Sequence, residues 1–376
     1  MINFNVPLFL NREERYLHQA IANRKLAGDG KFAKRCSCLL ENKLKCKKAL
    51  LTTSGTQALE LAAILAAIKQ GDEVIMPSYT FPSTANAFVL RGAKIVFVDI
   101  RPDTMNIDEN LIENAITKKT KAIVPVHYGG VACKMDTIDN IARKHKLLVI
   151  EDAAQAVGAF FKGKALGTIG DMGCFSFHET KNYTCGEGGA IILNRQEFIG
   201  RAEIIREKGT NRVKFFRGEV DKYTWVDIGS SGVLSELNAA YLCAQLEQME
   251  KVKRNRLAIW QRYYQGLTLL ADQGLITLPF VSQACEHNGH LFYIKVKDLS
   301  ERSKLVDYLK KNGIYAVFHY MPLHSTIAGR KYGRFYGRDR FTTKESQRLL
   351  RLPLYYGLEA KKINLIVRKI KDFYGQ

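Results

Sequence analysis

The stretch "TQALELAAILAAIKQGDEVIMPS", Thr56–Ser78, sets the character of the whole chain. Its first part is rich in alanine and leucine and apolar nearly all round, which predicts a buried helix with Gly71 as its C-cap. The second part, Asp72–Ser78, is a short apolar run typical of a strand that is buried on both faces. A buried helix followed directly by a buried strand indicates a layered α/β domain.

The same alternation continues along the next hundred residues. Between apolar runs, "MDTIDNIARKHK" repeats its apolar residues at helical spacing, with Asp136 as the expected N-cap. Strands alternating with helices predict a large domain with a mostly parallel sheet. The other expected strands are Lys94–Ile100, Lys121–His127, Leu147–Asp152, Gly173–Phe177 and Ala190–Asn194.

The pattern changes near residue 250. A basic amphipathic stretch, Leu246–Leu269, is followed by strand-like "HLFYIKV" and "IYAVFHY" with a helical segment between them, and by a helix near Lys361–Tyr374. We therefore expect a large α/β domain over residues 1–250 and a smaller α+β domain over residues 251–376. Sites in open α/β sheets lie at the carboxyl ends of strands, often near a domain boundary, so we look for chemistry there.

Charge and composition exclude some functions and favour others. The 376 residues include 57 Lys and Arg against 37 Asp and Glu, and the net charge of +20 favours an anionic partner. The basic residues are spread along the chain and show no nucleic-acid motif, so we expect no nucleic-acid partner. No apolar run approaches the roughly 20 residues that span a bilayer, and no signal-peptide pattern is visible. We expect a cytoplasmic protein with no membrane partner.

The eight cysteines are scattered and lack the spacing of metal ligands. We therefore expect free thiols, with neither a disulfide framework nor a metal site.

Two polar segments stand at predicted strand ends. Ser54, Gly55 and Thr56 supply hydroxyls, a tight turn and unpaired backbone N–H groups at a helix start, which is an anion site or an ordinary N-cap. In "VIEDAAQA", Asp152 ends a buried strand and Gln155 follows three residues later. A buried carboxylate needs a partner, such as a protonated ring nitrogen, unless it simply caps a helix.

A lysine completes the set. In "CFSFHETKNYTCGEGG", Cys174–Gly189, Ser176 ends a strand-like run and Lys181 follows it, before a glycine cluster. Such a lysine is either a solvated loop charge or an amine of lowered pKa that can form a Schiff base. A phosphate cradle, an acid for a ring nitrogen and an amine are what pyridoxal 5'-phosphate requires, and the aromatic stretch Pro77–Ala87 could supply a stacking ring. The sequence predicts this cofactor.

The order of "TSGTQAL", "PSYTF", "EDAAQA", "SFHETKNYT" and "GEGG" resembles the sugar aminotransferase family of fold-type I pyridoxal-phosphate enzymes, over essentially the whole chain. Longer runs, such as Met76–Glu109, are similar to the branch that aminates C4 of 4-keto-6-deoxy nucleotide sugars. The resemblance implies the fold-type I architecture, L-glutamate as amino donor, a nucleotide sugar as acceptor, and a homodimer with shared active sites.

The resemblance also implies roles for particular residues. Lys181 would form a Schiff base with the cofactor aldehyde, Asp152 would pair with the pyridine nitrogen, and Gln155 would lie near the ring hydroxyl. Phe81 would stack on the ring. The cofactor phosphate would be bound by Gly55, Thr56 and Ser176.

One position departs from the family pattern. In many relatives a segment of the second subunit contributes an asparagine to the phosphate, and here the matching stretch "GSSGVL" has the shorter Ser231. Expected substrate contacts are His178, Arg212, His319 and Tyr320. For His178 the alternative is a structural hydrogen bond, for Arg212 a solvated charge, and for His319 and Tyr320 domain packing.

Three other interpretations stay open. The acceptor could be another keto nucleotide sugar, since no motif determines the stereochemistry at C4. Some family relatives are dehydratases with a histidine in place of the lysine, and Lys181 argues against that branch. A non-enzymatic binder of anionic partners is the alternative of another class, because aminotransferase-like domains occur in transcription regulators, although no helix-turn-helix segment is visible here.

Overall fold

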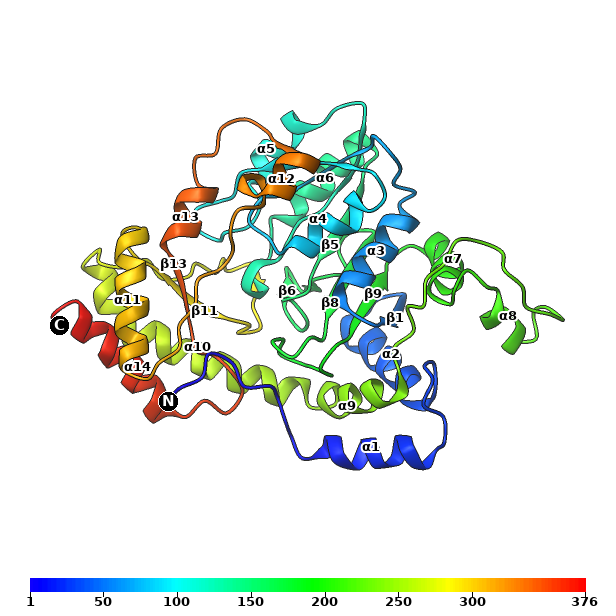
Figure 1. Ribbon diagram of the computed structural model, residues 1–376, viewed down its shortest axis with the longest axis horizontal. Helices are drawn as coiled ribbons and strands as arrows, with labels where there is room; N and C mark the ends of the chain where they lie inside the picture. Colours follow the sequence, from blue (N-terminus) through cyan, green and yellow to red (C-terminus); the bar gives the residue numbers. More distant parts are fainter.

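An eight-stranded sheet is the centre of the computed structural model, which describes all 376 residues (Figure 1). Neighbouring strands are parallel except for β9, which runs antiparallel to both of its neighbours. The predicted mostly parallel sheet is thereby confirmed. In spatial order the strands are β1 (Lys48–Thr52), β9 (Gly189–Leu193), β8 (Met172–Ser176), β5 (Leu148–Asp152), β4 (Thr120–Ile123), β2 (Glu73–Pro77), β3 (Lys94–Val98) and β12 (Gly333–Phe335).

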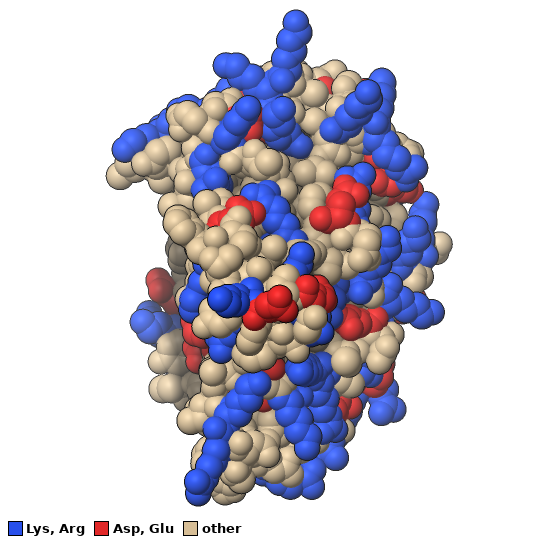
Figure 2. All heavy atoms as spheres, turned by 90° about the vertical axis from the view of Figure 1, so that its right-hand side faces the viewer, with Lys and Arg blue, Asp and Glu red and all other residues tan.

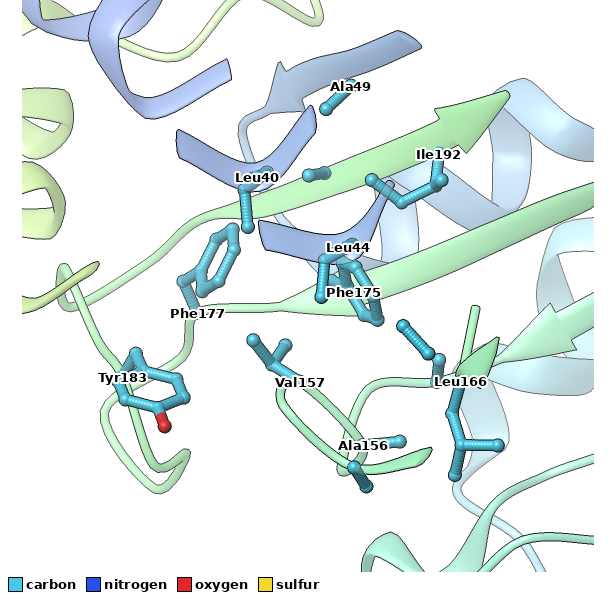
Figure 3. Close-up of a cluster of buried hydrophobic side chains, with 14 of the residues drawn as sticks. Leu40, Leu44, Ala49, Ala156, Val157, Leu166, Phe175, Phe177, Tyr183 and Ile192 are labelled. Carbon is cyan, nitrogen blue, oxygen red and sulfur yellow. The ribbon is translucent and has the colours of Figure 1, made fainter. Parts of the chain in front are cut away.

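Helices cover both faces of this sheet. Ile75 of β2 packs into the hydrophobic core on one face, while its neighbours Val74 and Met76 pack into the core on the other. Figure 3 shows part of the first core, where Leu40 and Leu44 lie over Phe175 and Ile192. Burial on both faces explains why the strands are continuous apolar runs rather than alternating ones.

Each core has its own set of helices. The first core contains α2 (Lys31–Leu44), α5 (Glu109–Ala115), α6 (Met135–His145) and α9 (Glu236–Leu246). The second contains α3 (Gly55–Leu65), α4 (Pro82–Val89) and α7 (Gln196–Arg206).

A third core is built mainly from the C-terminal part of the chain. It surrounds the antiparallel pair of β11 (Phe292–Lys295) and β13 (Leu349–Leu352), and it is closed by α10 (Met249–Asp272), α11 (Leu299–Lys311) and α14 (Ala360–Phe373). Ile2 also packs in this core and bridges to Ile314, so the first residues join the C-terminal unit in space. The expected boundary, between residues 250 and 251, falls in the first turn of α10. The division into residues 1–250 and 251–376 stays a prediction.

The remaining elements are short or peripheral. They are α1 (Arg12–Ala22), α8 (Arg212–Phe216), α12 (Ile327–Tyr332), α13 (Thr342–Arg348), β6 (Phe160–Phe161), β7 (Lys164–Ala165) and β10 (Cys285–Glu286), with single 3-10 turns at Tyr128–Gly130 and Leu323–Ser325.

The helix expected to have Gly71 as its C-cap ends five residues earlier, with Ala66 as the C-cap. Helix α3 ends at Leu65, and Ala67 takes the left-handed conformation with φ 52°. The N–H of Ile68 then bonds back to the carbonyl of Ala63 at 3.2 Å, which closes the helix end and turns Ile68 into the core. The prediction was wrong because burial of Ile68 ends the helix before the glycine is reached.

Two further local predictions are corrected. The N-cap of α6 is Lys134, and Asp136 lies inside the first helical turn, because the buried Met135 already begins the helix. The segment "IYAVFHY" forms no regular strand and makes only isolated bridges at Ile314 and Val317. Its partners there, Ile2 and Arg351, lie on two different segments, so no continuous ladder can form.

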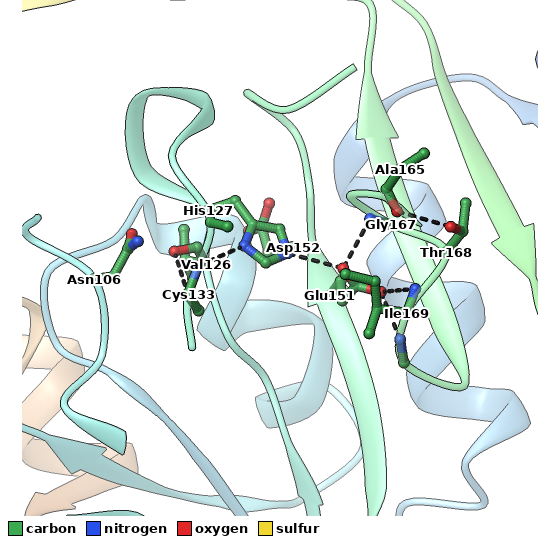
Figure 4. Close-up of polar contacts among 12 residues, drawn as sticks. Asn106, Val126, His127, Cys133, Glu151, Asp152, Ala165, Gly167, Thr168 and Ile169 are labelled. Carbon is green, nitrogen blue, oxygen red and sulfur yellow. Dashed lines mark hydrogen bonds and ion pairs between the residues drawn. The ribbon is translucent and has the colours of Figure 1, made fainter. Parts of the chain in front are cut away.

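Strand β5 ends with two neighbouring carboxylates, and Glu151 is the structural one (Figure 4). Its buried carboxylate accepts hydrogen bonds from the backbone N–H groups of Gly167, Ile169 and Gly170, each at 2.7 Å. The Nε2 of His127 lies 2.8 Å from it. Because the N–H of Cys133 donates to Nδ1 of His127 at 3.2 Å, the ring proton is on Nε2 and is donated to Glu151. This network ties the loop after β7 to the sheet.

Replacing Glu151 by glutamine tests this network. Glu151→Gln puts an amide NH₂ among four donors in a buried place, so we expect the free energy of unfolding to fall by about 3 kcal/mol. Urea denaturation measures the change. The exposed Glu286→Gln serves as the matched control and should change stability by less than about 0.5 kcal/mol. Equal effects of the two substitutions would contradict the structural role of Glu151.

Candidate active site

The expected phosphate-binding residues meet at the start of α3. Ser54 is the N-cap, and its side chain accepts from the N–H of Gln57 at 3.0 Å. The N–H groups of Gly55 and Thr56, in the first turn, have no acceptor within the helix. A Cβ at Gly55 would lie 2.8 Å from the Cβ of Ser176, so glycine is required for Ser176 to approach the turn this closely. Hydroxyls and free N–H groups are thus brought together at this helix start.

The second carboxylate of β5, Asp152, is buried but lacks a cationic partner. Its Oδ2 accepts from the hydroxyl of Thr84 at 2.7 Å, and its Oδ1 accepts from the N–H of Ala154 at 3.2 Å. No Lys, Arg or His side chain forms an ion pair with it. A buried carboxylate without a counter-charge is costly, so this position suits a positively charged group of a ligand.

Gln155 connects the sheet edge to the C-terminal part of the chain. Its Oε1 accepts from the N–H of Gly129 at 2.7 Å, and its Nε2 donates to the hydroxyl of Tyr320 at 3.0 Å. The ring of Tyr320 lies 6.1 Å from that of Phe81, measured between centroids. Phe81 is the N-cap of α4 and is 57% exposed, which leaves a ring face free beside this group.

His319 is held in its neutral form within an aromatic cluster. Its Nδ1 lies 3.0 Å from the hydroxyl of Tyr128, and its carbonyl accepts from the hydroxyl of Tyr79. Burial lowers the pKa of His319 well below its usual value, and the positive charges of Arg351 and Lys181 add to this. Neutral His319 can therefore act as a hydrogen-bond partner without adding charge.

Lys181 lies in the loop after β8, and its side chain keeps partial exposure within the site. Its backbone N–H donates to the carbonyl of His178 at 2.9 Å. Removal from water lowers the pKa of Lys181 to about 8, against the pull of Asp152 in the opposite direction and with the help of Arg351. A sizeable part of the amine is therefore neutral near pH 7.5, as a nucleophile requires.

His178 makes local contacts beside the lysine. Its Nδ1 lies 2.9 Å from the hydroxyl of Thr180, and its Nε2 lies 3.6 Å from Glu187. The structural hydrogen bond that we considered as its alternative role is present.

The two remaining predicted residues, Ser231 and Arg212, make none of the contacts described above. Ser231 is exposed and precedes Gly232, where an added Cβ would lie 2.4 Å from Nε2 of Gln57 in the first turn of α3. Arg212 begins α8, which projects away from the sheet at the right of Figure 1. Its guanidinium lies 3.3 Å from Glu207 and stacks on Phe216. Within its own chain, Arg212 is not brought to Lys181.

The structure adds three residues that had no separate indication in the sequence. Thr84 and Tyr79 lie inside the aromatic stretch Pro77–Ala87, which we noted only for a stacking ring. Arg351 is a single charge inside the apolar run "RLLRLPL", and that interruption was the available signal.

The donor set fits pyridoxal phosphate. The α3 turn offers N–H groups and hydroxyls for a phosphate, Asp152 offers an uncompensated carboxylate for a ring nitrogen, and Lys181 offers an amine. The structure brings no three His, Cys, Asp or Glu side chains together in a geometry that would hold a metal ion. None of its helices combines the length and apolar character that crossing a bilayer requires.

The reactivity of Lys181 can be measured in the cofactor-free chain. Competitive labelling with acetic anhydride, followed by mass spectrometry, should show a labelling midpoint near pH 8 for Lys181. Asp152→Asn should move this midpoint lower, because the carboxylate favours the ammonium form. Exposed Lys251, labelled in the same sample, is the reference. A Lys181 that labels with the same pH profile as Lys251 would mean an ordinary solvated loop charge.

The chain matches known proteins over most of its length. The model of the DegT/DnrJ/EryC1/StrS aminotransferase family matches residues 10–371. The chain is 38% identical over 347 residues to an uncharacterised protein, MJ1066, of Methanocaldococcus jannaschii, with 90% of this chain and 89% of that protein covered. It is 34% identical to the spore coat polysaccharide biosynthesis protein SpsC of Bacillus subtilis, with 87% and 85% covered.

Solved structures agree over the full length. The aminotransferase TlmJ from Streptoalloteichus hindustanus superposes with a TM-score of 0.91 at 26% identity, covering 100% of this chain and 99% of that one. Spr1654 from Streptococcus pneumoniae, assigned as a sugar aminotransferase, has a TM-score of 0.89 in its PLP form at 25% identity, covering 100% and 98%. The predicted fold class and cofactor are confirmed, and the non-enzymatic alternative is set aside. The chain belongs to the DegT/DnrJ/EryC1/StrS aminotransferase family and is a pyridoxal-phosphate-dependent transaminase of fold-type I.

Proposed function

We propose that this transaminase moves an amino group from L-glutamate to C4 of dTDP-4-dehydro-6-deoxy-D-glucose. The products are dTDP-4-amino-4,6-dideoxy-D-galactose and 2-oxoglutarate. The observation that carries the transaminase chemistry is the Lys181 amine, with its pKa lowered to about 8, near the uncompensated Asp152. The acceptor rests on the resemblance of Met76–Glu109 to the transaminase of enterobacterial common antigen synthesis. Another keto nucleotide sugar is the alternative.

Different residues bind the phosphate, the ring nitrogen and the ring hydroxyl of the cofactor. Gly55, Thr56 and Ser176 hold the phosphate at the start of α3, where the N–H groups and the helix dipole favour negative charge. Asp152 holds the proton on the ring nitrogen, and Gln155 donates toward the ring hydroxyl.

The ring face and the subunit boundary complete the binding site. Phe81 stacks on the ring, and Ser231 is the shorter replacement for the phosphate-binding asparagine of relatives.

Lys181 moves the proton in both halves of the reaction. Pyridoxal phosphate, when bound, supplies a ring that withdraws electrons from the carbon bearing the amino group. The Nζ of Lys181 takes the proton from Cα of L-glutamate, and in the second half-reaction it delivers a proton to C4 of the sugar. The lowered pKa matches this double use, because the amine can accept and donate a proton near neutral pH. His319, Tyr320 and His178 line the substrate side.

We further propose that the enzyme works as a homodimer through an arm, defined here as residues Arg212–Ile228. The arm projects from the body of the molecule with α8 (Figure 1). It exposes a group of aromatic side chains, with Trp225 77% and Phe216 70% exposed. An exposed apolar cluster of this kind is typical of a protein interface. A partner subunit that covers the arm would bring Arg212 toward the partner's site.

The charge on this side suits an anionic substrate. The face that carries α7 and α8 shows many Lys and Arg side chains with fewer acidic ones between them (Figure 2). A nucleotide sugar carries a diphosphate, and a basic surface raises its local concentration.

The two half-reactions provide the first test of the proposed function. L-Glutamate should bleach the visible absorption band of the holoenzyme, and dTDP-4-dehydro-6-deoxy-D-glucose should restore it. Lys181→Ala should lower turnover at least about 1000-fold, because the proton carrier is lost. The exposed Lys164→Ala is the control.

Two other outcomes would each reject one part of the proposed function. Bleaching by glutamate without restoration by this sugar would leave the transaminase and reject the acceptor. Normal turnover of Lys181→Ala would reject the role of the lysine.

The arm predicts the oligomeric state. Trp225→Glu puts a charge into the proposed interface, so we expect the dimer dissociation constant to rise at least about 30-fold. Sedimentation velocity measures it. Leu269→Glu is the control, at a residue of α10 that is 50% exposed. Helix α10 packs against α14, which lies at the opposite end of the molecule from α8 (Figure 1). A wild-type monomer, or an unchanged dimer in Trp225→Glu, would contradict the proposal.

A further inference from the structure

Arg351 faces the active site from the C-terminal unit. Strand β13 alternates, so that Leu350 and Leu352 pack into the third core while Leu349 packs on the opposite side. Arg351 shares that opposite side and stands in register with Tyr293 of β11. Leu349 and Tyr293 belong to a small cluster with Tyr79 and Tyr128, which lies beside His319 and Tyr320. The strand therefore presents the guanidinium to the substrate side of the site.

This guanidinium has no polar partner. Its Nε is buried without a hydrogen bond, and no carboxylate lies within ion-pair distance of the side chain. Other inward-facing cations of the same unit are compensated. Lys295 pairs with Glu345 at 2.8 Å, and Arg256 donates to the backbone carbonyls of Gly289 and His290. An arginine left without acceptors in a partly buried place has unused capacity for an anion.

The N-terminal segment holds the guanidinium in place without neutralising it. The carbon of the guanidinium lies 4.6 Å from the ring centre of Phe4. On one side of Phe4, Ile2 bridges to Ile314, and on the other side the amide of Asn5 donates to the carbonyl of Glu179 at 3.4 Å. The segment therefore runs from the C-terminal core to the loop that carries Lys181.

Arg351 lines a small cavity that reaches this loop. Its other walls include Phe4, His290 and Thr180, the residue immediately before Lys181. The positive charge of Arg351 also contributes to the lowered pKa of Lys181 and of His319, after the larger effect of burial.

We propose that Arg351 binds the α-carboxylate of the amino donor. This inference rests on the proposed function, in which L-glutamate reacts beside Lys181. In an amino acid the α-carboxylate is attached to the same carbon as the amine, so it must lie close to the reacting centre. In the nucleotide sugar the diphosphate is attached at C1, across the six-membered ring from C4, so it lies farther away. A guanidinium fork binds a planar carboxylate through two parallel hydrogen bonds.

The first test measures the glutamate half-reaction of the holoenzyme, which is monitored through the loss of the visible absorption band. Arg351→Gln should raise the glutamate concentration for half-maximal bleaching by about 10- to 100-fold, because a charged hydrogen-bond pair is lost. Arg351→Lys keeps the positive charge but lacks the guanidinium fork. Its glutamate concentration for half-maximal bleaching should lie between those of wild type and Arg351→Gln. The exposed Arg368→Gln on α14 is the matched control and should behave as wild type.

The second test compares amines with and without the α-carboxylate. Wild type should prefer L-glutamate strongly over 4-aminobutyrate, which keeps the distal carboxylate but has none beside the amine. Arg351→Gln should lose most of this preference and should leave restoration of the band by the keto sugar within about twofold of wild type. Its labelling midpoint at Lys181 should also move above about pH 8, because a neighbouring positive charge is removed.

The outcomes separate this inference from the proposed function. If L-glutamate fails to bleach the wild-type band, the proposed donor is wrong. If wild type is bleached and Arg351→Gln responds at the same concentration, the carboxylate role of Arg351 is wrong. A variant that loses the glutamate and sugar half-reactions equally would also overturn it. Should Arg351→Gln melt at a lower temperature than wild type, the properly folded Arg351→Lys decides the question by the same comparison.

Discussion

The two adjacent carboxylates at the end of β5 divide structure from chemistry. Glu151 and Asp152 point to opposite sides of one strand, and both are buried. Glu151 is satisfied by three backbone N–H groups and His127, so its charge is fully used in holding the loop after β7. Asp152 receives only one hydroxyl and one N–H and no cation. Donors within the protein therefore stabilise the charge of Glu151, whereas the charge of Asp152 stays available to a ligand.

The rest of the site balances that uncompensated charge. Asp152 favours the ammonium form of Lys181, whereas burial and Arg351 favour the neutral amine, and burial has the larger effect. The three groups come from β5, from the loop after β8 and from β13, so the balance depends on the packing of the C-terminal unit against the sheet. A rigid sheet edge, fixed through Glu151, keeps these separations constant.

The two ends of the chain meet at this boundary. Ile2 packs in the C-terminal core, and Phe4 stacks on Arg351. Strand β12, from the C-terminal part of the chain, pairs with β3 at the edge of the large sheet. The C-terminal unit is therefore held to the large one by backbone pairing and by the N-terminal segment, and its residues His319, Tyr320 and Arg351 are positioned relative to Lys181.

Local sequence alone determined six of the eight strands of the large sheet, the helices that correspond to α3 and α6, and the three segments of the site. Strands buried on both faces must be continuously apolar, and polar residues that interrupt such runs stand at strand ends, which is why Asp152, Ser176 and Lys181 could be recognised. The end of α3 at Leu65 was not predictable in the same way, because it depends on where Ile68 finds its core. The lowered pKa of Lys181 and the unpartnered state of Arg351 were decided only by the tertiary structure. Both depend on which charges from distant segments lie nearby and on how far water is excluded, and neither quantity is encoded in the neighbours along the chain.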